Sequence, residues 1–180
     1  MPSSECRVLV TGFGPFLDVR DNPSARVALA VDGRVANNAV LHGRALPVTY
    51  DGGPAETVAF AEALDAHVVI GVGVDRRTTT VDVETRAYNI GAGADILGQT
   101  PRILEVGGPP IVYSNVDAVV FASALGARVD DDAGRYVCNA WLYTVGRALL
   151  PRRRVVFVHV PAAGLDPDRL TAAIGQAFGG

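Results

Sequence analysis

The chain has 180 residues, of which 49% are hydrophobic and 19% charged, a composition typical of a globular protein rather than a disordered one. The formal net charge of −3 gives no electrostatic attraction to nucleic acid or to an anionic membrane, so neither is expected as a partner. The sequence contains no lysine, which excludes Schiff-base, P-loop-lysine and Ser-Lys chemistry.

Short apolar runs alternate with amphipathic segments along the chain, which predicts an α/β protein. A first strand is expected over 7–11, ended by the glycine-rich turn at 12–16, and Asn22-Pro23-Ser24 begins a helix that runs to about Val31. The elements expected next are a strand over 39–46, a helix over 54–64, a buried strand over 67–71 and a strand with one polar face over 78–89.

The second half continues the alternation. Residues 110–114 form either a short strand or a return loop, and the remaining elements are helices over 117–125, 136–149 and 166–178 and a buried strand over 155–160. The sequence has no internal repeat, linker or low-complexity segment, so a single domain over residues 1–180 is expected. Two cysteines, no signal peptide and no apolar run of about 18 residues predict a soluble cytoplasmic protein with reduced thiols.

Cys138 is the first candidate for chemistry, because it lies at the start of the helix expected over 136–149. The free N–H groups and the positive dipole end of a helix favour a thiolate, and the same amides can hold a developing oxyanion. The alternative interpretation is a small buried hydrophobic residue, which most cysteines are.

His159 and Glu84 are the candidates for a base and its orienting group. His159 lies near the carboxyl end of an otherwise apolar strand, where catalytic groups of parallel sheets gather, although a core histidine bonded to a backbone carbonyl is the alternative. Glu84 lies on the polar face of its strand and could hold the second ring nitrogen of a histidine, with a solvent-facing glutamate as the alternative. His42 and His67 are weaker candidates.

Other sites are disfavoured by the sequence. The glycines after the first strand lack the third glycine and the helix of a dinucleotide-binding loop, and no Gly-x-Ser-x-Gly motif is present. The histidines and cysteines lack metal-ligand spacing, and the acidic run at 130–132 is more typical of a solvated segment or a helix cap than of a cation site. No metal or cofactor is therefore expected.

Taken together, four blocks in this order resemble the pyroglutamyl-peptidase I (pyrrolidone-carboxylate peptidase) family of cysteine peptidases: VTGFGPF at 10–16 followed by Asn22-Pro23, ETRAYN at 84–89, DAGRYVCN at 132–139 and FVHVP at 157–161. The resemblance implies a catalytic set of Glu84, Cys138 and His159. It also implies an α/β/α sandwich around a twisted, mostly parallel mixed sheet, activity in the cytoplasm without a cofactor, and peptide substrates with an N-terminal pyroglutamyl residue. A homo-oligomer is a further implication, because many bacterial and archaeal members are tetramers while the mammalian form is a monomer.

A pyroglutamyl ring is flat and partly apolar and carries one lactam N–H and one C=O, so its pocket needs aromatic walls and a few fixed polar groups. The resemblance assigns the walls to Phe13 and Phe16, whose alternative role is core packing. Tyr136 and Val137 lie next to the nucleophile in the sequence, and Asn22 is expected to order the loop or to reach the ring.

The sequence departs from the family pattern before the glutamate. Bacterial members usually carry a Gly-Gln-Ala-Gly-Gly-Arg-like segment there, whereas this chain has GVDRRT at 73–78, closer to the animal version. The side chain that would donate to the lactam carbonyl, and the roles of Arg76 and Arg77, are therefore left open. The chain is also shorter than typical bacterial members, mainly after Pro161. Alternative functions are a related cysteine amidase acting on a different cyclic or acyl amide, and a non-catalytic binding module.

Overall fold

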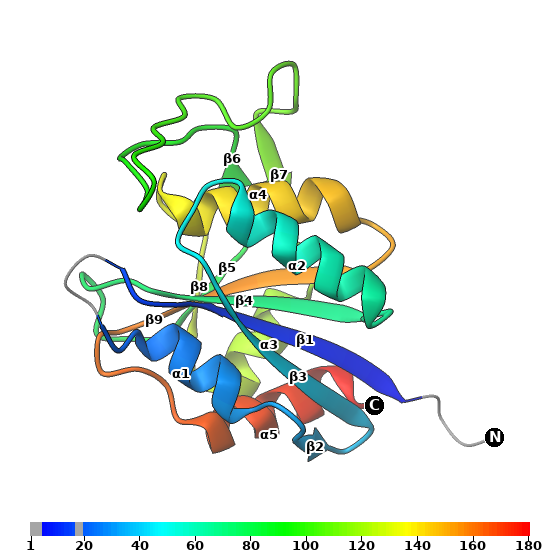
Figure 1. Ribbon diagram of the computed structural model, residues 1–180. Helices are drawn as coiled ribbons and strands as arrows, with labels where there is room; N and C mark the ends of the chain where they lie inside the picture. The colour runs from blue at the N-terminus through cyan, green and yellow to red at the C-terminus, as the bar shows by residue number, and fades with distance from the viewer. Residues whose placement is uncertain (1–4, 17–19) are drawn as a thin grey trace.

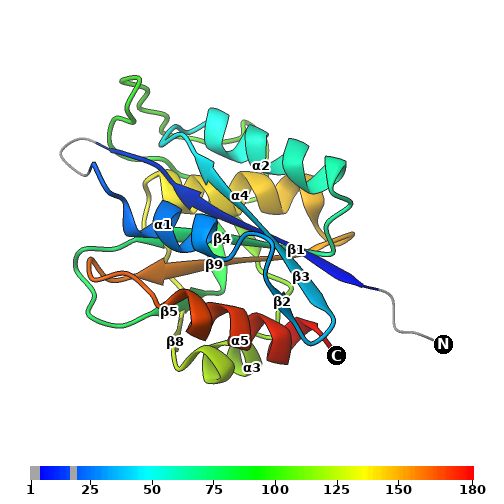
Figure 2. The same cartoon turned by 60° about the horizontal axis from the view of Figure 1, so that its bottom comes forward.

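The computed structural model describes residues 5–16 and 20–180, and helices cover both faces of its main sheet (Figures 1 and 2). The strands of this sheet are β1 Cys6–Phe13, β2 Val35–Ala36, β3 Ala39–Leu46, β4 Val68–Val74, β5 Asp82–Glu84, β8 Arg128–Asp130 and β9 Arg154–Val160. Their order is β2-β3-β1-β4-β9-β5-β8, with β2–β3 and β5–β9 antiparallel and the other neighbours parallel. The predicted mostly parallel, mixed sheet is confirmed.

The helices form the outer two layers. α1 Pro23–Ala30, α3 Ala118–Leu125 and α5 Pro167–Phe178 cover one face of the sheet, and α2 Gly52–Ala63 and α4 Val137–Leu149 cover the other (Figure 1). One core cluster contains Phe121 and Leu170 beneath the sheet, and the other contains Trp141 and Phe157 above it. Burying these apolar faces between layers is what stabilises an α/β/α sandwich.

The central strands β1, β4 and β9 are nearly continuous apolar runs because both of their faces are covered. The observed start of α1 agrees with the sequence, since the Asn22 side chain accepts a hydrogen bond from the Ser24 N–H and Pro23 takes the first helical position. α2 begins two residues before the expected Pro54.

The expected single strand over 78–89 is wrong. It is divided into β5 and β6 (Arg86–Tyr88), and β6 pairs with β7 (Ile111–Tyr113) in a separate two-stranded sheet. The division falls at Thr85. Its N–H donates to the Asp130 carbonyl in the main sheet, while its carbonyl accepts from the Ser114 N–H, directly after β7 of the two-stranded sheet. The 110–114 segment is therefore a strand rather than a loop.

The strands β2 and β8 were not expected from the sequence. Each has three residues or fewer, too short for the alternation that identifies a strand. Within residues 5–16 and 20–180, no helix reaches the length and apolar character that crossing a bilayer requires.

Candidate active site

The sheet and one helix bring the predicted catalytic residues to the same place. His159 lies one residue before the end of β9, between Gly73 of β4 and Asp82 of β5 in the strand register. Cys138 is the second residue of α4, which packs over β4 and β9. Cys138 and His159 line one groove, so the carboxyl ends of the central strands face the start of α4.

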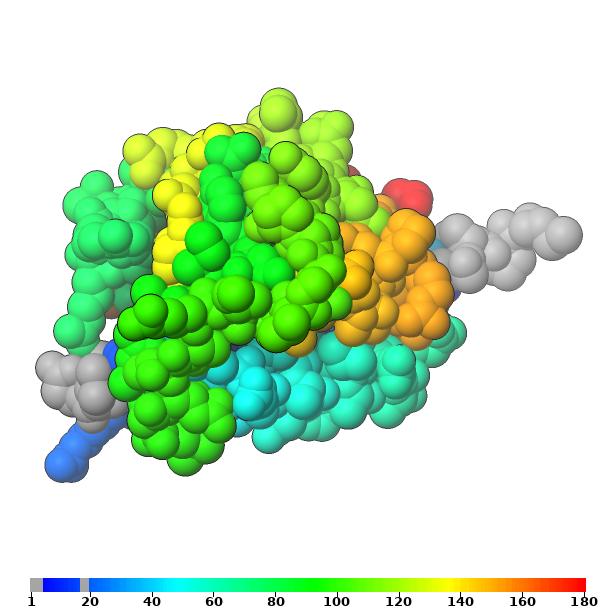
Figure 3. Space-filling model, turned by 90° about the horizontal axis from the view of Figure 1, so that it is seen from above, coloured from blue at the N-terminus to red at the C-terminus, as the bar shows by residue number. Residues whose placement is uncertain are grey.

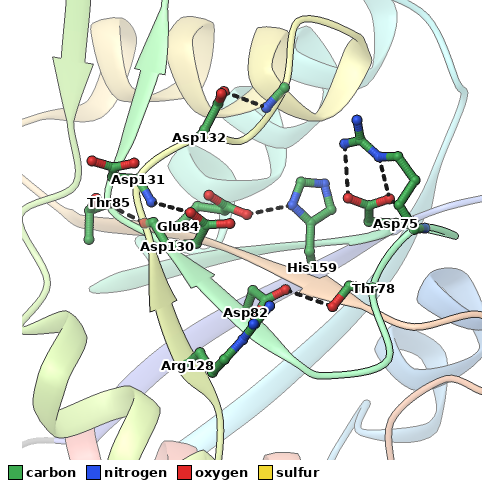
Figure 4. A network of polar contacts seen from close by, with 12 residues as sticks. Asp75, Thr78, Asp82, Glu84, Thr85, Arg128, Asp130, Asp131, Asp132 and His159 are labelled. Atoms are coloured by element: carbon green, nitrogen blue, oxygen red, sulfur yellow. Dashed lines mark hydrogen bonds and ion pairs between the residues drawn. The ribbon is translucent and has the colours of Figure 1, made fainter.

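Glu84 contacts His159 from the neighbouring strand. Glu84 Oε1 lies 2.6 Å from His159 Nδ1, and Figure 4 shows the carboxylate pointing toward the imidazole. Both side chains are buried, with exposed fractions of 1% for Glu84 and 8% for His159. The alternative of a solvent-facing Glu84 is therefore wrong. A carboxylate on Nδ1 holds the proton at that nitrogen and leaves Nε2 free to act as a base.

The charges at the site stabilise a protonated imidazole. Burial alone lowers the pKa of His159, but the Cys138 side chain and the Glu84 carboxylate outweigh it and raise that pKa to about 10. Burial raises the pKa of Glu84 and the hydrogen bond with His159 opposes it. An imidazolium facing sulfur is the ion-pair partner that a reactive thiolate requires.

Gly73 makes room for the Cys138 sulfur. A Cβ atom built on Gly73 would lie 2.6 Å from Cys138 Sγ and 2.8 Å from Phe157 Cζ, so only glycine fits. The sulfur therefore rests against the backbone of β4, directly beside the strand position that pairs with His159.

The start of α4 provides hydrogen-bond donors next to the sulfur. Tyr136 precedes the helix with extended backbone and makes no side-chain cap, and Val137 and Cys138 are the first helical residues. The first N–H groups of a helix have no partner within it. The Cys138 amide is thus placed to donate to an oxygen that develops negative charge near the sulfur.

A cavity of about 290 Å³ opens beside Cys138 and is lined mainly by apolar groups. All five residues expected to bind the ring contribute to it, together with Cys138 itself: Phe13, Phe16, Asn22, Tyr136 and Val137. Phe13 is also buried and part of the core, so its side chain both lines the cavity and packs in the core. Phe16 lies half-buried against Tyr136, with the ring centroids 5.7 Å apart. The cavity has the size and walls for a small, flat ring.

Asn22 orders the loop that carries the phenylalanines. Its Nδ2 donates to the Gly14 carbonyl at 3.0 Å, and its Oδ1 accepts from the N–H and the hydroxyl of Ser24. The Ser24 hydroxyl oxygen in turn accepts from the backbone N–H of Phe13. Of the two roles considered for Asn22, these contacts favour loop ordering.

A second, more open groove of about 580 Å³ meets the apolar cavity at Cys138. It contains His159 and two ion pairs, Asp75 with Arg77 and Asp132 with Arg135. Arg77 is mostly exposed and bonds both carboxylate oxygens of Asp75, whereas Arg76 lines the apolar cavity instead. The site thus has an apolar side and a charged side, with the sulfur between them.

Asp82 and the acidic run have structural partners. The buried Asp82 carboxylate accepts hydrogen bonds from Arg128, Thr78 and Thr80 below His159 (Figure 4). In the acidic run, Asp131 pairs with Arg86 and Asp132 pairs with Arg135. The described part of the chain holds no cluster of three or more potential metal ligands.

Sequence reasoning missed Asn139, the residue after Cys138. It is fully buried, its Oδ1 accepts from the Tyr88 N–H at 2.7 Å, and its Nδ2 donates to the carbonyls of Tyr88 and Ile90. Its amide therefore fastens the end of β6 and the residues directly after it to the first turn of α4. The signal was an asparagine on the otherwise apolar face of a helix. His42 and His67 lie elsewhere: His42 is in β3, and His67 accepts from Arg7 before β4 begins.

Comparisons with known proteins identify the family of the chain. The family model described as "Pyroglutamyl peptidase" matches residues 6–165. The chain is 34% identical to a pyrrolidone-carboxylate peptidase of Mycobacterium marinum, over 86% of this chain and 77% of that protein. It is 30% identical to a pyrrolidone-carboxylate peptidase of Klebsiella pneumoniae, over 95% of this chain and 88% of that protein.

Solved structures share the fold. Pyroglutamyl peptidase I of Bacillus amyloliquefaciens superposes with a TM-score of 0.88 over 97% of this chain and 96% of that one, at 23% identity. Pyrrolidone carboxyl peptidase of Thermococcus litoralis superposes with a TM-score of 0.84 over 96% and 91%, at 24% identity. By the family match and the sequence relatives, the chain belongs to the pyroglutamyl peptidase family.

Proposed function

We propose that this chain hydrolyses the amide bond after an N-terminal pyroglutamyl residue of a peptide, as a cysteine exopeptidase. The observation that carries the proposal is the meeting of an apolar, ring-sized cavity and a polar groove at Cys138, with His159 and Glu84 behind it. The ring occupies the apolar cavity. The leaving peptide extends along the groove that contains His159.

The chemistry proceeds by nucleophilic catalysis. The proton of the Cys138 thiol lies on His159 before the reaction; the Cys138 thiolate attacks the carbonyl carbon, and the Cys138 N–H stabilises the oxyanion. The C–N bond then breaks as His159 returns the proton to the leaving amine, which releases the shortened peptide and leaves a thioester. Water, deprotonated by His159, attacks the thioester, and the products are pyroglutamate and the free thiol. Glu84 holds the imidazole throughout.

The backbone of β4 supplies polar groups for the lactam. Over the residues described, β1 pairs with β4 only as far as Val72, and Ser24 binds the backbone of Phe13 where the pairing would continue. The Asp75 N–H bonds β9, so by strand alternation the N–H and C=O of Val74 face the β1 side. Because Val74 lines the cavity, its peptide group can donate to the lactam C=O and accept from the lactam N–H without a glutamine side chain.

We also propose a cytoplasmic location. Cys6 and Cys138 are both unpaired, and the proposed reaction needs Cys138 as a reduced thiol. This part of the proposal depends on the reactive cysteine and not on any targeting feature.

The test is a panel of amides of one fluorogenic amine, with pyroglutamyl, prolyl, glutaminyl and acetyl groups on the acyl side. Turnover of the pyroglutamyl amide alone is expected, because the prolyl ring lacks the lactam carbonyl and carries a cationic nitrogen. Turnover of another amide without the pyroglutamyl one would support the alternative of a different cysteine amidase. Absence of turnover across the panel would contradict the enzymatic proposal.

A further inference from the structure

Asp95 is a buried carboxylate outside the proposed catalytic set. It lies in the segment between β6 and β7, which Figure 3 shows in green between α2 (cyan) and the yellow start of α4. Its Oδ1 accepts from the N–H groups of Leu97 and Gln99, both at 2.9 Å, and its Oδ2 accepts from the Tyr50 N–H at 3.0 Å. Asp95 therefore folds its own loop and ties that loop to the residues before α2.

Two tyrosine hydroxyls donate hydrogen bonds to backbone carbonyls of the same loop. The Tyr50 hydroxyl donates to the Ala92 carbonyl at 2.8 Å, and the Tyr136 hydroxyl donates to the Ala94 carbonyl at 2.9 Å. The tyrosine rings meet edge to face, with their centroids 5.8 Å apart. Asp95 thus shapes the loop that carries both carbonyl acceptors, of which the Ala94 carbonyl is the one bound by Tyr136.

This position determines the shape of the ring cavity. Tyr136 and Val48 both line it, and the Ile96 N–H of the same loop bonds the Val48 carbonyl. Phe16, which also lines the cavity, contacts the Tyr136 ring. A displacement of the loop would therefore move two lining residues at once, while Cys138, His159 and Glu84 are held by α4 and the main sheet.

We propose that Asp95 is a positioning residue for substrate specificity, which fixes the width of the ring cavity by holding the 92–99 loop against Tyr50 and Tyr136. The inference rests on the proposed function, because it concerns binding of the pyroglutamyl ring. A carboxylate suits this place because it only accepts hydrogen bonds and three N–H donors converge on it. These donors hold the pKa of Asp95 below its usual value although burial opposes them.

The experiment compares Asp95→Asn with the wild type on the pyroglutamyl amide. An asparagine presents an NH₂ group to at least one of the N–H donors, so the loop loosens without loss of side-chain volume. We expect KM, and the inhibition constant of the unsubstituted lactam pyrrolidone, to rise about five- to tenfold while kcat stays within about twofold. The rate of Cys138 alkylation by iodoacetamide should not change, since the thiol is not displaced.

Asp117→Asn is the matched control, because Asp117 also accepts a backbone N–H, that of Val120, but caps α3 beneath the sheet. It should leave KM and the inhibition constant unchanged. Tyr136→Phe removes only the hydroxyl bound to Ala94 and should raise both constants. In the double variant Asp95→Asn/Tyr136→Phe the effects should be less than additive, because both act through one loop.

The outcomes separate the two proposals. A wild-type chain without turnover of the pyroglutamyl amide contradicts the proposed function itself. If the wild type is active but Asp95→Asn keeps the wild-type KM and inhibition constant, only the role of Asp95 is contradicted. A parallel fall of kcat and of the alkylation rate in Asp95→Asn would contradict that role too, because it would mean that the thiol itself has moved. If Asp95→Asn does not fold, Tyr136→Phe is the remaining test. An unchanged KM and an unchanged inhibition constant in that variant would contradict the proposed role of the loop in fixing the cavity.

Discussion

Glu84 Oε1 and His159 Nδ1 are 2.6 Å apart although 75 positions separate the two residues in the sequence. The antiparallel pairing of β5 with β9 brings them together, and β8 flanks β5 on its other side. The hydrogen bond therefore lies inside the protein, where Glu84 supports the positive charge of the imidazole with little screening by water.

Glu84→Gln should lower kcat about 10²- to 10⁴-fold, because a neutral amide can hold the ring but cannot stabilise the imidazolium. The Glu84 carboxylate is one of the groups that raise the pKa of His159, so its loss lowers that pKa and weakens the thiolate–imidazolium pair. Alkylation of Cys138 near pH 6 should slow accordingly. Glu62→Gln, on the exposed side of α2, is the control and should change neither rate. Unchanged kcat in Glu84→Gln would contradict the role of Glu84.

The two cysteines offer a second contrast. Cys138→Ala should abolish turnover, whereas Cys6→Ala at the start of β1 should leave it intact. Cys138 should also react with iodoacetamide near pH 6 faster than a free thiol, whose pKa is about 8.5, because it faces a protonated His159. The measurement is turnover together with the mass-labelled site. Loss of activity in Cys6→Ala alone would reverse the assignment of the nucleophile.

The sequence predicted the layers and the site residues better than it predicted their environment. Cys138 and His159 were expected at a helix start and a strand end because these signals are local, and the structure places them there. The burial of Glu84 could not be predicted, since the alternation over 81–84 is that of a strand with one face in water. β5 is paired with β8 along one edge and with β9 along the other, and β9 places His159 against the Glu84 carboxylate; neither contact can be seen in the local sequence.

The ring cavity was only partly predictable for the same reason. Phe13, Phe16 and Tyr136 were expected around it, but nothing near Asp95 in the sequence indicates that its loop reaches Tyr50, 45 positions earlier. Such contacts depend on the path of a long loop, which has no periodicity to reveal it. The functional roles of these residues stay predictions for the experiments described.

Arg128→Gln should make the protein more sensitive to acid. Burial opposes the charge of Asp82, but Arg128, Thr78 and Thr80 hold its pKa below the usual value. A lowered pKa contributes stability above the ordinary value of 3.8 that is lost as pH falls through the folded-state value. Without Arg128 the pKa of Asp82 rises, so the loss begins at higher pH.

The measurement for Arg128→Gln is urea unfolding across the acid range. The variant should unfold at lower urea concentration at neutral pH and have a higher acid midpoint than the wild type. Arg147→Gln is the control, because its partner Glu105 is 40% exposed and water can replace the arginine. Equal acid midpoints for the wild type and Arg128→Gln would show that the two threonines suffice to hold the Asp82 charge.

Gly73→Ala should reduce catalysis by displacing the nucleophile. The added Cβ would lie 2.6 Å from Cys138 Sγ, so the sulfur or the backbone of β4 must move. Gly71→Ala is matched to it, since the three atoms nearest to its Cβ would belong to Phe157 and Trp141, at 2.5 Å from Phe157 Cδ2 and 2.7 Å from Trp141 Cζ3, and not to Cys138. Both substitutions overpack the core above the sheet and should cost about 1–3 kcal/mol of the free energy of unfolding.

The two variants should differ in rate rather than in stability. Gly71→Ala should keep kcat near the wild-type value at temperatures where it is folded, whereas Gly73→Ala should lose about 10²-fold, because a shift of about 1 Å in a reacting atom has that effect. Thermal unfolding by circular dichroism and kcat on the pyroglutamyl amide are measured on the same samples. Equal kcat values in the two variants would mean that the sulfur relocates without harm. The contact between Gly73 and Cys138 would then be a matter of packing, and the position of the nucleophile would depend on α4 alone.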